Sequence, residues 1–477
     1  MKEEQALESI LTYGSYIGRD RTGALQIDGC EAEALAKEFG TPLWVISERT
    51  IRDNYRHLTA AFRKQYPSTE IAYASKANPQ PAIIRLVGLE GGRVDAVTAG
   101  HIEMLLAGGL APTDIIFNGN NKTLEELRWA LQHGVHVINA DSLEEVQLLA
   151  ELQPPSAPPA AIALRLAIDP APHLEDDSAF GLAQESFKFG MDEPEALAAA
   201  RVLHGHPALT LAGLHNHVGF SAYGLEYSAE LDLKRHRRCV NQVIGFARQL
   251  KQDLGVHLEH INLGGGYRKA RPHGYGPKAI INMPSADEYA AEIAGTIARS
   301  VERYQLGTPR LILEAGGYIV ADAVVLLATV GFTKIRRTVS GMERWAFLDN
   351  TSAYHFVRRL MYGFHHHVMV AGRSDGSDLR RVNIGGPICT DDTVAWNVPL
   401  PPLKRGDIVA VLDQGAYCEA VTSDFCGVPI PAAVLACDGV ADVIRKRETA
   451  SELVSKFSVP GRLKLDEESA TQAGPLT

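Results

Sequence analysis

The feature that most constrains the fold is a regular alternation of strand-like and helical segments between residues 70 and 314. The strand-like runs cover residues 70–75, 93–97, 114–118, 135–139, 161–166, 209–214, 258–263 and 310–314. The helical patterns between the first of them include Pro81–Leu89, 100–107, 123–133 and 142–152. Such alternation predicts a parallel sheet, and eight strands within about 250 residues favour a closed (β/α)8 barrel. An open doubly wound sheet is the alternative, disfavoured because no GxGxxG loop follows the first strand.

The segments before and after the barrel have residue patterns that differ from its strand–helix alternation. After about residue 321 the chain turns to short apolar runs separated by turn residues, which predicts an all-β domain. Before the barrel, residues 25–27 and 42–46 have strand character, and 31–39 form a helical pattern that ends at Gly40. We therefore predict an N-terminal segment, 1–47, part of which pairs with the β domain; the barrel, 48–320; the β domain, 321–445; and a tail, 446–477.

Composition and charge limit the partners. The 477 residues are 45% hydrophobic and 22% charged, with a net charge of −10. No long run of lysine or arginine occurs, so we expect no nucleic-acid partner. No apolar stretch approaches about 18 residues, and the acidic N-terminus lacks the apolar core of a secretory signal, so we expect no membrane span and a cytoplasmic protein. The six cysteines form no CxxC pair, so we expect no metal site.

Lys76 lies at the carboxyl end of the first predicted barrel strand, among small residues and just before Asn78 and Pro79. Reactive side chains of (β/α)8 barrels lie at this end of the strands. A lysine amine in such a place can form a Schiff base with an aldehyde cofactor. Lys76 is therefore the candidate attachment point for such a cofactor.

Other candidate residues follow later barrel strands. Gly264, Gly265 and Gly266 follow the seventh strand, and their backbone N–H groups can approach a phosphate closely. Glu314 ends the eighth strand and can hold a protonated pyridine nitrogen through a charge-assisted bond of about 1.5–3 kcal/mol. His217 follows the sixth strand and can stack flat on a cofactor ring. Each signal alone is weak, because a glycine-rich turn is commoner than a phosphate site, an acid such as Glu314 can belong to an ordinary loop, and a lone histidine is more often structural than catalytic.

The predicted β domain contributes Cys389, which follows a Gly-Gly-Pro turn and precedes Thr390, Asp391 and Asp392. A free cysteine is commonly a small buried hydrophobe, but this polar neighbourhood is unlike a core. A thiol whose pKa is near neutrality can donate a proton to a carbanion. Cys389 is therefore a second candidate catalytic residue.

These clusters, in this order along the chain, resemble the motifs of the fold type III pyridoxal-phosphate enzymes, above all the diaminopimelate and ornithine/arginine decarboxylases. The resemblance covers about residues 20–440. It implies an alanine racemase-like (β/α)8 TIM barrel, a C-terminal all-β domain and pyridoxal 5′-phosphate as cofactor. It also implies that Lys76 binds the cofactor covalently and that Cys389 donates its proton across the interface of a homodimer with shared active sites.

The resemblance also implies which residues hold the cofactor and a small amino-acid substrate. His217 stacks on the ring, Glu314 contacts its nitrogen, and the glycine run and Tyr417 contact the phosphate. The implied cofactor-binding residues are Lys76, His217, Ser221, Gly264, Gly265, Gly266, Glu314 and Tyr417. The implied substrate-binding residues are Arg358, Tyr362, Thr390 and Asp391.

Departures from the family pattern concern the distal end of the substrate. Gly317 stands where the arginine of a Glu-Pro-Gly-Arg run helps to hold a distal carboxylate. Thr390 replaces the acidic residue that follows the cysteine, and Phe220 replaces the serine after His-x-Gly, with Ser221 one position later. The chain keeps the cofactor residues and changes the distal ones, which indicates a conjugated amino acid, such as a carrier-bound or citryl-linked one, rather than diaminopimelate.

The resulting prediction is a pyridoxal-phosphate-dependent α-decarboxylase of an amino acid or an amino-acid conjugate. An amino-acid racemase is one alternative, but such enzymes usually have arginine in place of Glu314. A non-catalytic binder that has kept the fold is another, disfavoured by the presence of Lys76, His217, Glu314 and Cys389 together.

Overall fold

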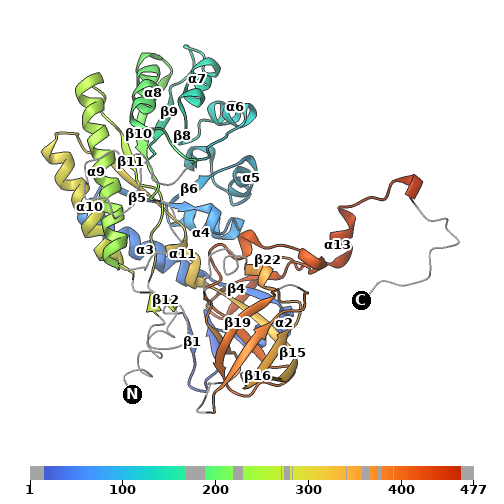
Figure 1. Ribbon diagram of the computed structural model, residues 1–477. Helices are drawn as coiled ribbons and strands as arrows, with labels where there is room; N and C mark the ends of the chain where they lie inside the picture. The colour runs from blue at the N-terminus through green and yellow to red at the C-terminus, as the bar shows by residue number, and fades with distance from the viewer. Residues whose placement is uncertain are drawn as a thin grey trace.

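The computed structural model describes residues 16–167, 188–218, 229–269, 271–272, 280–281, 283–339, 341–356, 365–373, 376, 378–389 and 391–463. It contains a barrel surrounded by helices and, beside it, a β domain (Figure 1). The chain passes from the β domain into the barrel and back again, because strands from both ends of the sequence share one sheet.

Eight parallel strands close into a barrel in the order β10-β11-β14-β5-β6-β7-β8-β9. They are β5 (Thr69–Ala74), β6 (Arg93–Ala96), β7 (Ile115–Phe117), β8 (Val137–Ala140), β9 (Ala160–Arg165), β10 (Leu209–His215), β11 (His260–Asn262) and β14 (Arg310–Ala315). The ring closes where β14 pairs with β5, with Glu314 opposite Ala72. Each strand overlaps a predicted run. The (β/α)8 prediction is therefore confirmed, and the alternative of an open sheet is wrong.

Helices on the outside of the barrel connect its strands (Figure 1). They are α3 (Glu48–Gln65), which precedes β5, and then α4 (Pro81–Leu89), α5 (Ala99–Ala107), α6 (Leu124–His133), α7 (Leu143–Leu152), α8 (Glu193–Gly205), α9 (Ala229–Leu254) and α10 (Ala286–Arg303). Reciprocal side-chain caps fix several starts, as at Thr123 with Glu126 and Ser285 with Glu288. Because a capping residue keeps an extended backbone, α6 and α7 begin one residue later than predicted.

The β domain is built on a nine-stranded sheet. Its strands are β4 (Leu43–Ser47), β15 (Val324–Thr338), β16 (Gly341–Leu348), β17 (Val368–Val370), β18 (Arg380–Gly385), β19 (Thr393–Leu400), β20 (Ile408–Val411), β21 (Ala432–Cys437) and β22 (Val440–Arg445). Strand β4 precedes the barrel in sequence, yet it lies between β15, to which it is antiparallel, and β21, to which it is parallel. The prediction of an all-β second domain is therefore confirmed in that the domain is mostly β.

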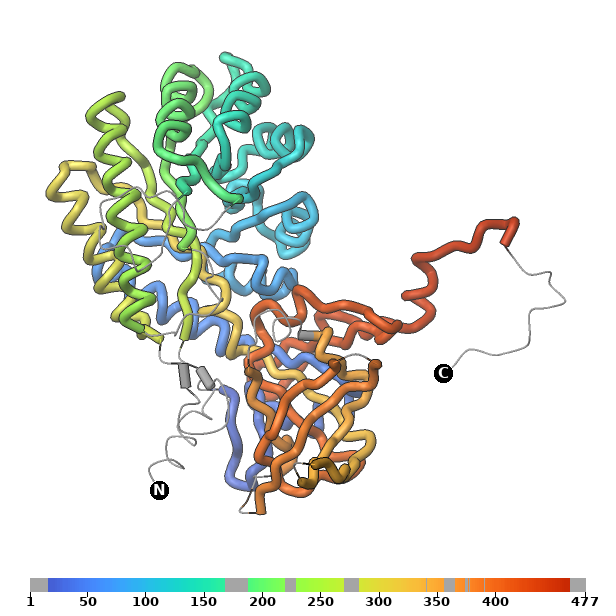
Figure 2. The backbone as a smooth tube through the Cα atoms, in the orientation of Figure 1, coloured from blue at the N-terminus to red at the C-terminus, as the bar shows by residue number. Residues whose placement is uncertain are grey.

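Small elements complete the two parts. They are β1 (Ile17–Arg19), β2 (Leu25–Ile27), β3 (Cys30–Glu31), α2 (Ala32–Phe39), β12 (Arg271–Pro272), β13 (Ile280–Ile281), α11 (Gly317–Val320) and α13 (Ala450–Ser455). Leu25 and Leu35 share a buried cluster with Leu327 and Leu412, so the N-terminal elements cover one face of the β domain. The segment that contains α13 extends away from both domains (Figure 2).

One hydrophobic core continues from the barrel into the β domain. It includes Trp44 on β4, Leu58 on α3, Tyr73 on β5 and Leu326 on β15, each with essentially no exposed surface. Burial of a large apolar side chain contributes roughly 1.5–3 kcal/mol. This shared core therefore holds the β domain firmly against β5, the strand that leads into Lys76.

Candidate active site

Lys76 is presented by a single turn of 3-10 helix, Ser75–Ala77, that directly follows β5. The turn is anchored to the neighbouring strand, because the N–H of Ser75 donates to Asp95 Oδ1 at 2.8 Å and its hydroxyl donates to the Asp95 carbonyl at 2.6 Å. The Lys76 Nζ lies 4.0 Å from Asp95 Oδ2. The lysine therefore occupies the carboxyl end of the barrel, as predicted, beside a buried carboxylate.

The charge of Lys76 depends on opposing effects. Burial lowers the pKa of its amine, but the nearby Asp95, Tyr417 and Glu314 outweigh burial and raise the pKa above its ordinary value. About a third of the side chain, 34%, remains exposed. The amine is therefore cationic yet accessible to a small molecule.

Glu314 ends β14 and is 1% exposed. Its Oε1 accepts hydrogen bonds from Asn118 Nδ2 and Asn262 Nδ2, each at 2.9 Å. Its Oε2 lies 3.5 Å from His215 Nε2 and makes no hydrogen bond with the residues that the structure describes. Burial acts to raise its pKa, but His215 and Lys76 hold the pKa well below the usual range. The result is an ionised buried carboxylate with one oxygen left to accept a proton donor.

The pKa of Asp95, at the end of β6, is shifted in the opposite direction from that of Glu314. Burial raises the pKa of its carboxyl to about 6, and the neighbouring charge of Glu314 adds to this against the opposing charge of Lys76. Two buried carboxylates thus flank the Lys76 amine with different proton affinities. Such divergence is typical of catalytic sites.

The glycine run after β11 packs closely on His217. A Cβ at Gly264 would lie 2.4 Å from the Asn216 carbonyl oxygen and 2.9 Å from the His217 Cα, and φ at Gly264 is +61°. A Cβ at Gly265 would lie 3.1 Å from the His217 Nε2. A residue with a Cβ therefore cannot replace Gly264 or Gly265 without moving the surrounding atoms. The bare backbone can approach a phosphate, as a cradle for that group requires.

His217 is neutral in this environment. Burial first, and then the positive charges of Lys76 and Arg165, lower the pKa of its imidazole well below the ordinary value. A neutral imidazole stacks on a ring without adding a positive charge beside the Lys76 amine. His217 packs against Gly264 and Gly265 and is close enough to Lys76 to feel its charge, and its stacking on a cofactor ring stays a prediction.

Tyr417 joins the β domain to the lysine turn. Its backbone N–H donates to the carbonyl oxygen of Ala77 at 2.9 Å, with φ of +57° at Tyr417. The same loop places Glu419 where its Oε2 accepts from Asn78 Nδ2 at 3.2 Å. The structure thus brings the Tyr417 loop beside Lys76, although more than 300 residues separate them in sequence.

Cys389 is exposed, on the connection between β18 and β19. The turn that carries it is held by buried Asp392, whose carboxylate accepts from the Ser352 hydroxyl at 2.8 Å and from the Ile388 N–H at 3.1 Å. Its thiol interacts with that of Cys426, whose pKa is raised by burial and by the hydrogen bond with Cys389. Asp392 is therefore a structural anchor, whereas Asp391 is exposed. Ser221, Arg358, Tyr362 and Thr390 lie outside the described residues.

Several residues of this site were not predicted from the sequence. They all lie at the carboxyl ends of barrel strands: Asp95, Asn118, Arg165, His215 and Asn262. A polar residue at the end of each predicted strand was the available signal. It does not say which of these side chains meet across the barrel, because that depends on ring closure.

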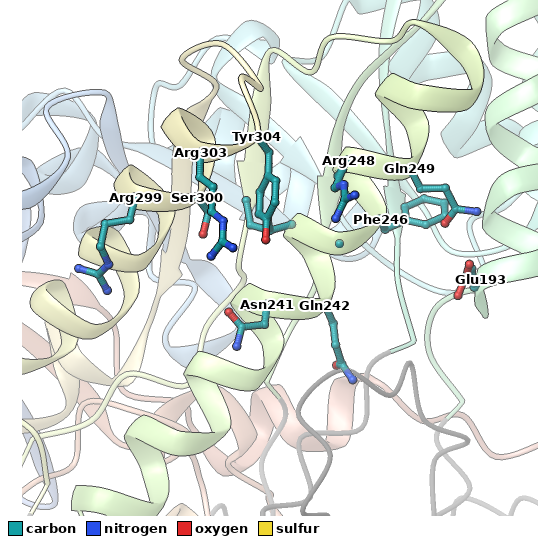
Figure 3. A pocket seen from close by; sticks show the side chains of 12 residues that line it. Glu193, Asn241, Gln242, Phe246, Arg248, Gln249, Arg299, Ser300, Arg303 and Tyr304 are labelled. Atoms are coloured by element: carbon teal, nitrogen blue, oxygen red, sulfur yellow. The ribbon is translucent and has the colours of Figure 1, made fainter.

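A cleft lies elsewhere, on the outside of the barrel between α9 and α10. Its volume is about 660 Å³, and Arg248 and Arg303 flank the ring of Tyr304 at 5.2 and 5.5 Å (Figure 3). None of its lining residues is a predicted site residue. It is therefore separate from the candidate active site.

Among the described residues, no group of three or more His, Cys, Asp or Glu side chains could hold a metal ion. In the same part of the chain, no helix has the length and apolar character needed to cross a membrane.

Comparison with known proteins agrees with this site. The family described as "Pyridoxal-dependent decarboxylase, pyridoxal binding domain" matches residues 52–321. The chain is 34% identical over 451 residues to the diaminopimelate decarboxylase of Methanothermobacter thermautotrophicus, across 92% of this chain and 97% of that protein. It is 29% identical to the diaminopimelate decarboxylase of Bacillus subtilis, across 93% and 97% of the two chains. The crystal structure of the M. jannaschii enzyme in complex with L-lysine matches with a TM-score of 0.82 and 29% identity, across 95% of this chain and 100% of that one.

A closed parallel barrel with a lysine and a buried carboxylate at its strand ends, joined to a β domain, defines a fold type III pyridoxal-phosphate enzyme. The chain belongs to the pyridoxal-dependent decarboxylase family, in its diaminopimelate and ornithine decarboxylase branch. It is a carboxy-lyase that acts on an amino-acid substrate and uses pyridoxal 5′-phosphate. The predicted family, cofactor and class of enzyme are therefore confirmed.

Proposed function

We propose that this chain removes the α-carboxylate of an amino acid or amino-acid conjugate at the site built around Lys76 and Glu314. The observation that carries this proposal is the buried Glu314 carboxylate, which is ionised and has one oxygen without a hydrogen bond from the described residues. A pyridine nitrogen that carries a proton is a fitting donor for that oxygen. The ionised acid also disfavours a racemase, which functions with a less electron-withdrawing ring.

The roles of the other residues follow from their positions. Pyridoxal phosphate, when bound, supplies a protonated ring that accepts the electrons released as CO2 leaves. Lys76 provides the amine for covalent attachment, and His217 stacks on the ring. Gly264–Gly266 and Tyr417 bind the phosphate. The bare backbone of this run, which the packing of Gly264 against Asn216 and His217 requires, supports this assignment.

We further propose that Cys389 protonates the α-carbon and that it belongs to the site of a partner subunit. Support comes from its exposure on a turn that Asp392 holds in place, because an exposed thiol can reach across an interface. The protein then functions as a homodimer. We propose the cytoplasm as its compartment, which the free thiols of all six cysteines support.

The substrate we propose differs from diaminopimelate at its distal end. Gly317 begins α11, and outside its chain neighbours and its own helix backbone the described atom nearest to an ideal Cβ there is the Cβ of Ala416, at 4.0 Å. Space is therefore left where related enzymes have an arginine side chain. Decarboxylation of diaminopimelate itself is the second candidate, favoured by the relatives at 29–34% identity.

A CO2-release assay separates the two candidates. We expect meso-diaminopimelate to be turned over with a kcat/KM at least about tenfold below that of an N-acylated or citryl-linked diamino acid, which corresponds to about 1.4 kcal/mol. Gly317→Arg should raise the kcat/KM for meso-diaminopimelate, whereas Gly245→Arg, on the outer helix α9, should not. Efficient turnover of meso-diaminopimelate by the unmodified enzyme would establish the second candidate instead.

A further inference from the structure

One amide, that of Asn118, lies between the two buried carboxylates of the site. Its Nδ2 donates to Glu314 Oε1 at 2.9 Å and to Asp95 Oδ2 at 3.3 Å. All three side chains are buried, with exposures of 6%, 1% and 0% for Asn118, Glu314 and Asp95. Because an amide nitrogen carries two hydrogens, a single group can satisfy one oxygen of each acid.

A second amide fixes the orientation of the first. Asn139 Nδ2, on the adjacent strand β8, donates to Asn118 Oδ1 at 2.7 Å. This bond requires the Asn118 oxygen to face β8 and its nitrogen to face the carboxylates. Asn139 is held in turn through its carbonyl oxygen, which accepts from the buried Lys122 Nζ at 2.8 Å. The Asn118 amide is therefore oriented by Asn139 on β8, two strands away from Asp95 on β6.

Close carboxylates normally cannot both stay ionised, because each anion raises the proton affinity of the other. Burial and then Glu314 raise the pKa of Asp95, against the charge of Lys76 and the hydrogen bonds from Ser75 and Asn118. At Glu314 burial also raises the pKa, and His215, Lys76 and the hydrogen bond from Asn118 lower it. Asn262 assists from β11, but only at Glu314. Among the described residues, the amide of Asn118 therefore bonds to both Asp95 and Glu314.

We propose that Asn118 is a positioning residue that keeps Asp95 and Glu314 ionised together beside Lys76. Asp95 then balances the charge of the Lys76 amine while Glu314 holds the ring nitrogen. The inference rests on the proposed roles of Lys76 and Glu314. It adds that the charge state of the site is set by an amide that does not itself react.

Other titratable groups on or beyond strands β5, β9, β10 and β11 surround this pair and determine how it responds to pH. They are Lys76 after β5, Tyr73 on β5, Arg165 on β9, His215 on β10, His217 beyond it and Tyr267 beyond β11. The side chain of Asn118 bonds to Asp95, Glu314 and Asn139 and carries no charge, so replacing it alters the donor and leaves these charged groups in place.

The test is a pH titration of the visible absorbance of the holoenzyme, which reports the environment of the cofactor bound at Lys76. In Asn118→Leu the two acids lose their shared donor and hold protons more tightly. The midpoint of the titration should therefore move up by about one pH unit. Asn118→Ser keeps one hydroxyl donor and should shift the midpoint by less. Turnover should fall through kcat rather than KM, because the substrate is not touched.

Asn54→Leu is the matched control. Asn54 is also buried and donates to a carboxylate, that of Asp322 at 2.8 Å, on the outside of the barrel. It should lower the melting temperature without moving the midpoint. A wild-type midpoint in both Asn118 variants, with the cofactor bound, would refute the inference. If the leucine variant does not fold, the serine variant decides. Absence of the visible band in the wild type would instead refute the proposed function.

Discussion

The backbone N–H of Tyr417 donates to the carbonyl oxygen of Ala77, the residue that follows Lys76, at 2.9 Å. This bond ties a loop of the β domain to the turn that presents the lysine. A second bond, from Asn78 Nδ2 to Glu419 Oε2 at 3.2 Å, reinforces it. The position of Lys76 therefore depends on a part of the chain that lies outside the barrel.

Gly415→Ala should disturb this junction severely. An ideal Cβ at Gly415 would lie 1.6 Å from the Val320 carbonyl oxygen, so the loop must move. We expect loss of retained cofactor after dialysis and a lower melting temperature. Gly245→Ala is the control, because no atom lies within 4 Å of its Cβ. In the interior of α9, that change should stabilise the protein by about 1 kcal/mol. Normal cofactor retention in Gly415→Ala would contradict the proposed coupling.

Lys76→Ala should abolish covalent attachment of the cofactor. Borohydride reduction followed by peptide mass spectrometry should place the label on Lys76 in the wild type and nowhere in the variant. Lys251→Ala, which removes an amine that donates to the carbonyl oxygens of Tyr304 and Gln305 on the outside of the barrel, should retain the label. A labelled peptide recovered from Lys76→Ala would show that another lysine holds the cofactor.

Glu314→Gln should slow the chemical step while the cofactor stays bound. The amide cannot accept a proton with the strength of an ionised acid. A charge-assisted bond of about 1.5–3 kcal/mol corresponds to a loss in kcat of roughly 10- to 150-fold. Glu292→Gln, which alters an ion pair with Arg237 on the outer helices, should leave kcat unchanged. An unaltered kcat in Glu314→Gln would remove its assigned role.

A mixture of two inactive subunits should recover activity if Cys389 acts in a partner's site. Lys76→Ala and Cys389→Ala homodimers should each turn over poorly. In heterodimers one of the two sites then has both native residues, so random reassociation should restore about a quarter of the wild-type rate. No recovery, with heterodimers shown to be present by mass spectrometry, would place both residues in the same subunit's site.

His260 should make the fold sensitive to acid. It is 5% exposed, and burial lowers the pKa of its imidazole to about 3. Between about pH 6.5 and 3 the unfolded chain binds a proton that the folded chain does not. The free energy of unfolding should therefore fall by up to about 1.4 kcal/mol per pH unit as the pH drops through this window. Denaturant unfolding at pH 7 and pH 5 should show a smaller loss in His260→Gln. The exposed His257→Gln should behave like the wild type, and an identical loss in all three proteins would refute this assignment.

The amino-acid sequence by itself determined the barrel and its reactive ends. Strand-length apolar runs alternate with capped helices, and this local pattern is readable without any partner strand. The positions of Lys76, Glu314 and the Gly264–Gly266 run at strand ends followed from it. Phosphate cradles and attachment lysines are recognisable because their chemistry needs particular residues next to one another in the chain.

Only the tertiary structure decided which side chains meet. Asn118 and Asn262 come from different strands and converge on Glu314 because the barrel closes between β14 and β5. Tyr417 reaches Ala77 because the β domain packs against the barrel through one continuous hydrophobic core. The charge states of Asp95 and Glu314 follow from these contacts and not from residue type. Hydrogen bonds and Coulomb interactions act over a few ångströms in space, whereas a hydrophobic pattern encodes only the periodicity of each element.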